Sequence, residues 1–340
     1  MELRKAIKAA STGTIAPIYV CYGPESYFMK QLIDTITEQA IEPEHREFAV
    51  SKFDLQETPV EQVIEDAETL PFMVPRKIVI AKNAVLFTGA KDSGKVDHDV
   101  DRLAAYLKSP VDYSVLIFTV NADKLDERKK IVKALKDQDA LVPCLPLLGD
   151  DLTRWVQDRA ARLRFTLLPG AAEQLVLNTG GHLQALHSEL EKLALFAGDG
   201  GQVSAQLVDE LVARSAEQNV FLLIEDIVQL RLDKALTTLH ELLKMKEEPI
   251  KIVNLLARQF RIMLQVKELV QQGYSHQQIA SQIGLHPYAV KLADGQTRKY
   301  DTAKLSGILS QLADLDYRMK SGRIDKVLGL ELFLLGLAAA

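Results

Sequence analysis

The first half of the chain contains one run that is apolar almost throughout, Tyr113-Ser114-Val115-Leu116-Ile117-Phe118-Thr119-Val120. A strand in the middle of a parallel sheet is covered on both faces, so it lacks the alternation of a half-exposed strand. The run therefore predicts a central parallel strand. On either side of it, strand-like and helix-like patterns alternate, which indicates an α/β domain with crossover helices.

The same alternation predicts the rest of this domain. Further strands are expected at 15–22, 48–53, 76–84 and 140–145, and helices at 26–41, 61–68, 96–108 and 125–136. After Gly149 no further strand is expected, because the remaining patterns are helical and end in helices with leucine-rich faces. We therefore predict a fold of the α/β plus all-α class, with domains at 1–149, 150–213 and 214–340.

Composition is that of an ordinary globular protein, with 340 residues of which 47% are hydrophobic and 26% charged. The first residues are too charged for a signal peptide and no apolar run reaches membrane-spanning length, so a cytoplasmic location and no membrane partner are expected. Cys21 and Cys144 lie in apolar runs and are expected to be buried free thiols. Two cysteines cannot build a disulfide framework or a typical zinc site, and no metal is predicted.

Charge is distributed unevenly along the chain. The net charge of −5 argues against a protein that coats nucleic acid over its whole surface. The segment from Ala213 to Ala340, however, contains 17 Lys and Arg and 14 Asp and Glu. Its net charge is therefore +3, and that of the remainder of the chain is −8. The basic excess is compatible with a nearby DNA backbone and equally with solubility alone.

The turn after the first strand is where a nucleotide-binding α/β domain holds phosphate. A working loop needs several glycines and a Lys followed by Ser or Thr. Here Gly23-Pro24-Glu25-Ser26 has one glycine, a proline without an N–H and a glutamate that repels phosphate, and Lys30 lies a turn too late. The third strand ends in Ala81-Lys82-Asn83-Ala84, without metal-binding acids. These residues argue against an ATPase, and no catalytic residue or cofactor is predicted.

A second stretch separates an acidic helical segment from the third strand, Thr69-Leu70-Pro71-Phe72-Met73-Val74-Pro75-Arg76. Its two prolines exclude one continuous helix or a central strand. Leu70, Phe72 and Met73 are therefore expected at a helix end or on a loop. There they either pack under the domain or face a partner.

One later segment has the pattern of a helix-turn-helix motif, with a capped helix, a glycine turn and a second helix between Ser275 and Lys291. A recognition helix presents Arg, Asn or Gln to base edges, and Pro287-Tyr288-Ala289-Val290-Lys291-Leu292-Ala293 offers little of that. The alternatives are a DNA-binding regulator that uses residues 275–293 and a helical hairpin that serves packing. The second is favoured.

Motifs over the whole length carry a resemblance to one family. They are Pro17-Ile18-Tyr19-Val20-Cys21-Tyr22-Gly23-Pro24-Glu25, Leu70-Pro71-Phe72, Lys124-Leu125-Asp126-Glu127-Arg128-Lys129-Lys130, Ser188-Glu189-Leu190-Glu191-Lys192-Leu193, Asn219-Val220-Phe221, Leu256-Ala257-Arg258-Gln259-Phe260-Arg261, Ile279-Ala280, Leu285-His286-Pro287-Tyr288-Ala289-Val290-Lys291 and Lys320-Ser321-Gly322. In order and spacing the chain resembles the delta subunit of the bacterial DNA polymerase III clamp loader, in its Gram-positive form.

The resemblance implies a degenerate AAA+ module, made of a parallel-sheet domain and a helical lid, followed by a helical collar domain. In the turn Gly181-His182-Leu183-Gln184, Gln184 stands where ATPase relatives carry an arginine that senses the γ-phosphate. The implied function is to bind the sliding clamp and open its ring, so that the clamp can be loaded onto primed DNA during replication. The resemblance also implies that this chain is not catalytic by itself.

In this family a helix tip inserts apolar residues into a pocket of the clamp, and by position these would be Leu70, Pro71, Phe72 and Met73. The implied partners are the sliding clamp (beta subunit), the tau/gamma and delta prime subunits through the collar, and primed DNA. The holoenzyme is a DNA-directed DNA polymerase, a nucleotidyltransferase, but nothing in this chain resembles the paired metal-binding acids of polymerisation. Because a bare apolar patch favours aggregation, we predict that the tip is partly masked in the free chain.

Overall fold

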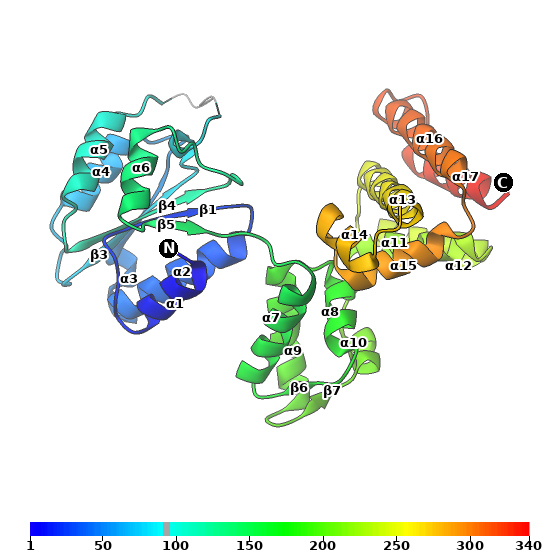
Figure 1. Ribbon diagram of the computed structural model, residues 1–340, viewed down its shortest axis with the longest axis horizontal. Coiled ribbons are helices and arrows are strands. Elements are labelled where there is room, and N and C mark those ends of the chain that lie inside the picture. Colours follow the sequence, from blue (N-terminus) through cyan, green and yellow to red (C-terminus); the bar gives the residue numbers. More distant parts are fainter. Residues whose placement is uncertain (91–95, 340) are drawn as a thin grey trace. The chain divides into compact units, whose positions relative to one another are not determined.

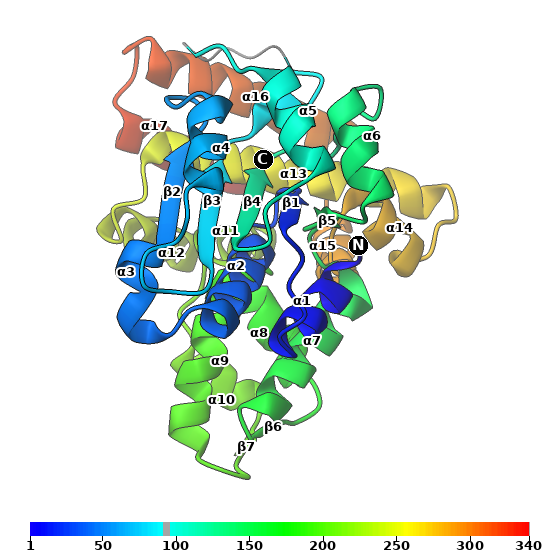
Figure 2. The same ribbon diagram turned by 90° about the vertical axis from the view of Figure 1, so that its left-hand side faces the viewer.

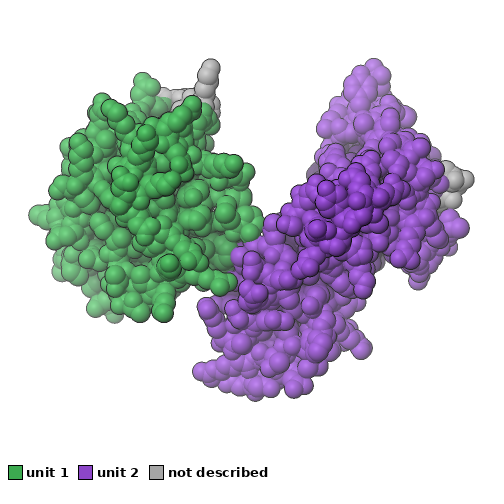
Figure 3. Space-filling view, in the orientation of Figure 1, with its two compact units in different colours: residues 1–146 green, residues 147–340 purple. Residues whose placement is uncertain are grey.

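The computed structural model describes residues 1–90 and 96–339 and divides the chain into two compact units, residues 1–146 and 147–340 (Figure 3). The first unit ends close to the predicted domain end at residue 149. The further division of the second unit into a lid at 150–213 and a collar at 214–340 stays a prediction.

The first unit is built on a five-stranded parallel sheet in the order β2-β3-β4-β1-β5. Its strands are β1 (Ile18–Tyr22), β2 (Val50–Asp54), β3 (Lys77–Lys82), β4 (Ser114–Val120) and β5 (Leu141–Pro143). Its helices are α1 (Leu3–Ser11), α2 (Ser26–Ala40), η1 (Pro43–His45), α3 (Arg46–Ala49), α4 (Val60–Glu68), η2 (Val85–Phe87), α5 (Val100–Lys108) and α6 (Lys130–Asp137). Helices α1 and α2 cover one face of the sheet, and α4, α5 and α6 cover the other (Figures 1 and 2).

Strand β4 lies in the middle of the sheet, as its apolar sequence predicts. It pairs with β1 on one side and β3 on the other, and Val115, Leu116, Ile117 and Phe118 are all buried. Since helices cover both faces, each side chain of this strand enters a core whichever way it points. The α/β part of the predicted fold class is confirmed, and α1 is an element that the patterns did not predict.

The second unit is mainly helical and contains α7 (Gly149–Arg162), α8 (Ala171–Thr179), α9 (Leu183–Ala197), α10 (Ala205–Leu211), α11 (Ala216–Val228), α12 (Leu232–Lys244), α13 (Pro249–Gln271), α14 (His276–Ile283), α15 (Pro287–Thr297), α16 (Thr302–Lys320) and α17 (Lys326–Ala339). The prediction that no strand follows Gly149 is wrong. Strands β6 (Thr166–Leu167) and β7 (Gln202–Val203) pair in parallel. Strands of two residues leave no alternation in the sequence, so only the tertiary pairing reveals them.

The predicted leucine-rich faces form one core, in which α11, α12, α13, α16 and α17 pack together. Leu239, Leu242, Phe260 and Met263 are fully buried there. Among residues 1–90 and 96–339, no helix combines the length and the apolar character needed to cross a membrane.

Helices α14 and α15 form the helix-turn-helix that the sequence predicts. Ser275 and Gln278 make a reciprocal capping box at the start of α14, and Gly284 ends that helix with φ +71°. The inner faces pack on α13 through a small cluster that includes Val266, Ile279 and Val290. These contacts agree with the favoured interpretation, a hairpin that packs, while the DNA-binding alternative stays untested.

Candidate functional site

Among the described residues of the first unit, the three most exposed large apolar side chains lie in the loop that follows α4. Leu70, Phe72 and Met73 are 73, 75 and 77% exposed. Side chains this open are not local core, so the interpretation in which they pack under the domain is wrong, and contact with a partner stays a prediction. Among the described residues of the first unit none covers these side chains, so the predicted partial masking is not found within this unit. We call Leu70, Pro71, Phe72 and Met73 the apolar tip.

Helix α4 carries the tip and is fixed to the domain by its inner face. Val60, Val63, Ile64 and Ala67 are fully buried, at the i, i+3, i+4, i+7 spacing of one helical face. The backbone N–H of Val60 donates to His98 Nδ1 at 3.2 Å, which satisfies a free donor at the start of the helix. The anchored helix can hold its last residues in a defined place.

Two side chains tie down the end of α4, just before the tip, through three hydrogen bonds. The ammonium group of Lys77, which is buried at the start of β3, donates to the Asp66 backbone carbonyl at 2.6 Å and to Asp66 Oδ1 at 2.8 Å. The Tyr113 hydroxyl donates to the Glu68 carbonyl at 2.8 Å. Carbonyls in the last turn of a helix have no partner within the helix, so these bonds stop it from fraying.

Glu68 also makes an ion pair with Arg102 of α5, on the outer side of the same helix end. Beside it, burial and the negative charge of Glu68 raise the pKa of Tyr106 to about 12, so this phenol stays neutral at physiological pH. Helix α5 thus holds the end of α4 through a charged group and a buried aromatic ring.

The backbone of the tip turns sharply and makes its side chains point outward. Thr69 leaves the helix in extended conformation, and Met73 has a positive φ of +57°, which is uncommon for a residue with a side chain. Pro71 and Pro75 prevent α4 from continuing and keep the loop from joining the sheet. The loop therefore ends one element and starts the next without burying its apolar residues.

The turn after β1, at the other edge of the sheet, is filled by the protein's own atoms. Gly23 has φ +136°, and a Cβ placed on it would lie 2.1 Å from the carbonyl oxygen of Cys144. The backbone N–H of Gly23 donates to the carbonyl of Val120 at 3.1 Å. The backbone N–H of Glu25 donates to the carbonyl of Cys144 at 3.1 Å. These backbone donors are therefore not free to surround a phosphate.

The N-terminus of α2 carries a carboxylate where a phosphate would have to bind. Glu25 is the N-cap residue, and its Oε1 accepts from the N–H of Tyr27 at 3.1 Å. The positive end of the helix dipole is thereby neutralised by an internal anion. Lys30 is exposed on the helix beyond. The residues of this turn do not fit the phosphates of a nucleotide.

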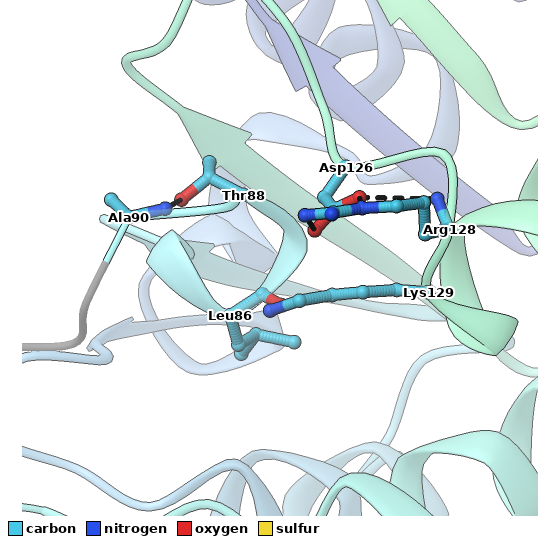
Figure 4. A network of polar contacts seen from close by, with 6 residues as sticks. All are labelled: Leu86, Thr88, Ala90, Asp126, Arg128 and Lys129. Carbon is cyan, nitrogen blue, oxygen red and sulfur yellow. Dashed lines mark hydrogen bonds and ion pairs between the residues drawn. The ribbon is translucent and has the colours of Figure 1, made fainter.

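A polar network orders the connection between β4 and α6 (Figure 4). Arg128 donates to both carboxylate oxygens of Asp126 at 2.9 Å, and these bonds with the backbone N–H of Arg128 lower the pKa of Asp126 to about 2. Lys129 Nζ donates to the Leu86 carbonyl at 2.7 Å, and Thr88 accepts from the N–H of Ala90 at 3.2 Å. The network therefore keeps the Asp126 carboxylate ionised, at the same edge of the sheet as the β1 turn.

The sequence reasoning found the tip but missed the residues that support it. Lys77, Asp66 and Tyr113 lie in different elements, and their spacing carries no motif. One signal was present: Lys77 opens a strand that is otherwise apolar, Ile78-Val79-Ile80-Ala81. A buried lysine needs a partner, so this position predicts a nearby carboxylate. Within the described residues, no group of three or more His, Cys, Asp or Glu could hold a metal ion.

Comparison with known proteins agrees with this architecture. Two family models match, "DNA polymerase III, delta subunit" over residues 19–145 and "DNA polymerase III delta subunit, C-terminal domain" over residues 217–337. A curated relative, DNA polymerase III subunit delta of Bacillus subtilis, is 42% identical over 330 residues, which are 97% of this chain and 95% of the relative. The chain belongs to the DNA polymerase III delta subunit family. The solved structure of the Bacillus subtilis DNA clamp loader delta protein matches with a TM-score of 0.71 and 41% identity, over 99% of this chain and all of that one.

This delta-family chain has a further exposed apolar surface, on its last helix. Leu328, Leu332 and Leu335 of α17 are 49, 53 and 42% exposed. Beside them runs a groove of about 520 Å³ between α16 and α17. Gly329 lets the two helices approach closely, because a Cβ there would lie 2.9 Å from Leu315. Three leucines along one helix face are suited to another protein.

Proposed function

We propose that this chain is the clamp-opening subunit of a clamp loader, and that the apolar tip is the part that binds the sliding clamp. The observation that carries the proposal is the tip itself, with three large apolar side chains exposed on a loop whose supporting helix is fixed at both ends. Membership of the delta family supports the same role.

The energetics fit a small interface of this kind. Burying one Leu or Phe side chain stabilises a complex by about 1.5–3 kcal/mol. A few such anchors in a pocket can dominate a contact. Because the tip is already ordered, little conformational entropy is lost when it binds. Preferential binding to an open ring would shift the clamp towards that state, by no more than the difference in affinity between the two states.

The proposed role requires no catalysis by this chain. At the β1 turn, where a relative with an active site would hold ATP, Gly23 is packed against Cys144 and Glu25 caps α2. A nucleotide would have to displace an internal carboxylate and break backbone bonds of the sheet. We therefore assign any ATP dependence of clamp opening to sibling subunits, which would control access to the tip.

The α16–α17 surface is our proposed contact with those siblings. It is apolar and lies in residues matched by the C-terminal family model. Burial of its leucines against tau/gamma or delta prime subunits would hold the loader together. Primed DNA would then lie beside this chain within the assembly.

The test is binding of the purified chain to the sliding clamp, comparing wild type with Leu70→Ala/Phe72→Ala. Two truncated anchors at about 1.5–3 kcal/mol each predict a loss of affinity of at least about a hundredfold. The matched control is Leu195→Ala/Phe196→Ala, since this pair at the end of α9 is also exposed, at 88 and 60%. Circular dichroism and urea unfolding would show that all three proteins are folded.

Equal binding by wild type and the tip variant would contradict the location of the site. Loss of binding in the α9 control as well would show a nonspecific apolar effect. Absence of binding by all three would contradict the clamp-opening role itself.

A further inference from the structure

The basic excess of the C-terminal part of the chain is concentrated in three consecutive helices. The segment from Pro249 to Lys299, which spans α13, α14 and α15, contains seven Lys and Arg and only two acidic residues, Glu268 and Asp294. In the rest of Ala213–Ala340, ten Lys and Arg face twelve acids. The net charge of this segment is therefore +5, and that of the rest of residues 213–340 is −2. The basic excess lies in these three consecutive helices.

The arginines of this region differ from the others in their partners. Arg214, Arg231 and Arg318 pair with carboxylates at 2.8, 2.7 and 3.7 Å, and the guanidinium of Arg323 lies 5.1 Å from the Tyr317 ring centroid. The three remaining arginines of residues 213–340 are exposed and form no ion pair with any described residue. They are Arg258 and Arg261 on α13 and Arg298 just after α15.

Lys291 is a fourth exposed cation of the same kind, on the outer face of α15 one turn before Gly295. A Cβ on Gly295 would have no atom within 4 Å, so a ligand can approach the backbone there. Asp294, three residues further on, makes no ion pair with Lys291, and its carboxylate lies 3.2 Å from His276 Nε2. Lys291 therefore offers an exposed positive charge on α15 that no described residue pairs with.

The other exposed residues of these helices are amides and hydroxyls rather than apolar anchors. Exposed polar side chains include Asn254, Gln265, Gln277, Ser281 and Gln282. Apolar exposure is confined to Val270 and Tyr274, at the junction of α13 and α14. A protein interface needs a desolvated apolar centre, which α17 has and this region lacks. Arginine together with amide and hydroxyl donors is the set that contacts phosphate oxygens.

The helix-turn-helix arrangement does not extend to reading bases. The N-terminal turn of the second helix, which contacts base edges in such motifs, is Pro287-Tyr288-Ala289. None of these side chains can make the bidentate bonds that distinguish bases. The exposed cations lie instead on α13, further along α15 and just after it.

We propose that α13–α15 form a nucleic-acid backbone surface, in which Arg258, Arg261, Lys291 and Arg298 contact the phosphates of duplex DNA without sequence preference. The proposal rests on the proposed function only for the presence of primed DNA beside the chain. Three to four such contacts predict that affinity falls by about 40- to 150-fold between 50 and 200 mM salt.

The experiment measures binding of the full chain to two fluorescent duplexes of unrelated sequence, across a salt series. The variants are Arg258→Gln/Arg261→Gln and Lys291→Gln/Arg298→Gln. The matched control, Lys244→Gln/Lys246→Gln, removes the same charge from the end of α12, and all six residues are exposed. Each α13–α15 variant is expected to lower the slope of log affinity against log salt by about 2. The control should stay near the wild-type slope.

Wild-type slopes in both variants, or an equal decrease in the control, would overturn the proposal. A tenfold or larger preference for one duplex would overturn the backbone interpretation in favour of base reading. Absence of DNA binding at 50 mM salt would also overturn the proposal. It would favour an acidic protein as the ligand of this surface instead. The clamp affinity of the α13–α15 variants should equal that of wild type. This readout separates failure of this proposal from failure of the clamp-opening role.

Discussion

The apolar tip and the β1 turn lie at opposite edges of the same sheet and have opposite relations to solvent. The turn follows the carboxyl end of β1, where ligands of parallel α/β domains usually bind, and is closed by Cys144 and Glu25. The tip precedes the amino end of β3 and leaves Leu70 and Phe72 uncovered. The comparison teaches that the edge where parallel α/β domains usually bind ligands is closed here, whereas the site that we propose lies at the opposite edge.

Buried or partly buried contacts adjoin both regions. At the turn, the contacts occupy the donors that a ligand would use. At the tip, Lys77 and Tyr113 bind only the end of α4, so the apolar side chains stay free. The same kind of support therefore closes one site and presents the other.

The largest expected effect comes from opening the closed turn. Gly23→Ala places a methyl group 2.1 Å from a backbone oxygen of the neighbouring segment, at a φ that L-residues rarely adopt. Strain and overlap together should lower the free energy of unfolding by at least about 3 kcal/mol. Urea denaturation measures this. The control is Gly13→Ala, which has φ +82° but nothing within 4 Å, so it should cost only about 1 kcal/mol. Similar losses in both variants would show that Gly23 serves backbone conformation alone.

A smaller effect is expected from loosening the support of the tip. Lys77→Met leaves Asp66 without its partner, and because that carboxylate is 28% exposed we expect a loss of about 2 kcal/mol in unfolding free energy. Clamp affinity should fall less than in the Leu70/Phe72 variant, since the anchors remain. The control is Lys82→Met at the exposed end of the same strand, with a change within about 0.5 kcal/mol. Unchanged stability of Lys77→Met would mean that the core holds α4 without this pair.

The smallest effect concerns the carboxylate near the closed turn. The folded pKa of Asp126, about 2, lies below the ordinary value of 3.8, so its contribution to stability is present above pH 4 and is lost as pH falls through 2. Arg128 is 87% exposed, so salt should weaken the pair further. In Arg128→Gln the carboxyl ¹³C titration of Asp126 should move towards 3.8. A midpoint that stays near 2 would show that the backbone N–H of Arg128 alone holds the charge.

Patterns of one residue type were enough to predict much of this molecule. The apolar run of β4 predicts a central strand, and the prolines at 71 and 75 predict that α4 stops before the tip. Elements without a pattern were missed. Strands β6 and β7 are two residues each, and α1 is a short charged helix whose Ala6 and Ala10 enter the core only through tertiary packing.

For the candidate site, the sequence by itself identified which residues form the tip. Prolines restrict the backbone next to them, and large apolar side chains are visible in the sequence without knowledge of the tertiary structure. It also showed that the β1 turn lacks the residues of a phosphate loop. Only the tertiary structure decided that the tip is exposed and that its support comes from Lys77 and Tyr113. Exposure and hydrogen bonding depend on what the rest of the chain brings nearby. Residues 66, 77 and 113 meet only because β3 and β4 pair beside α4.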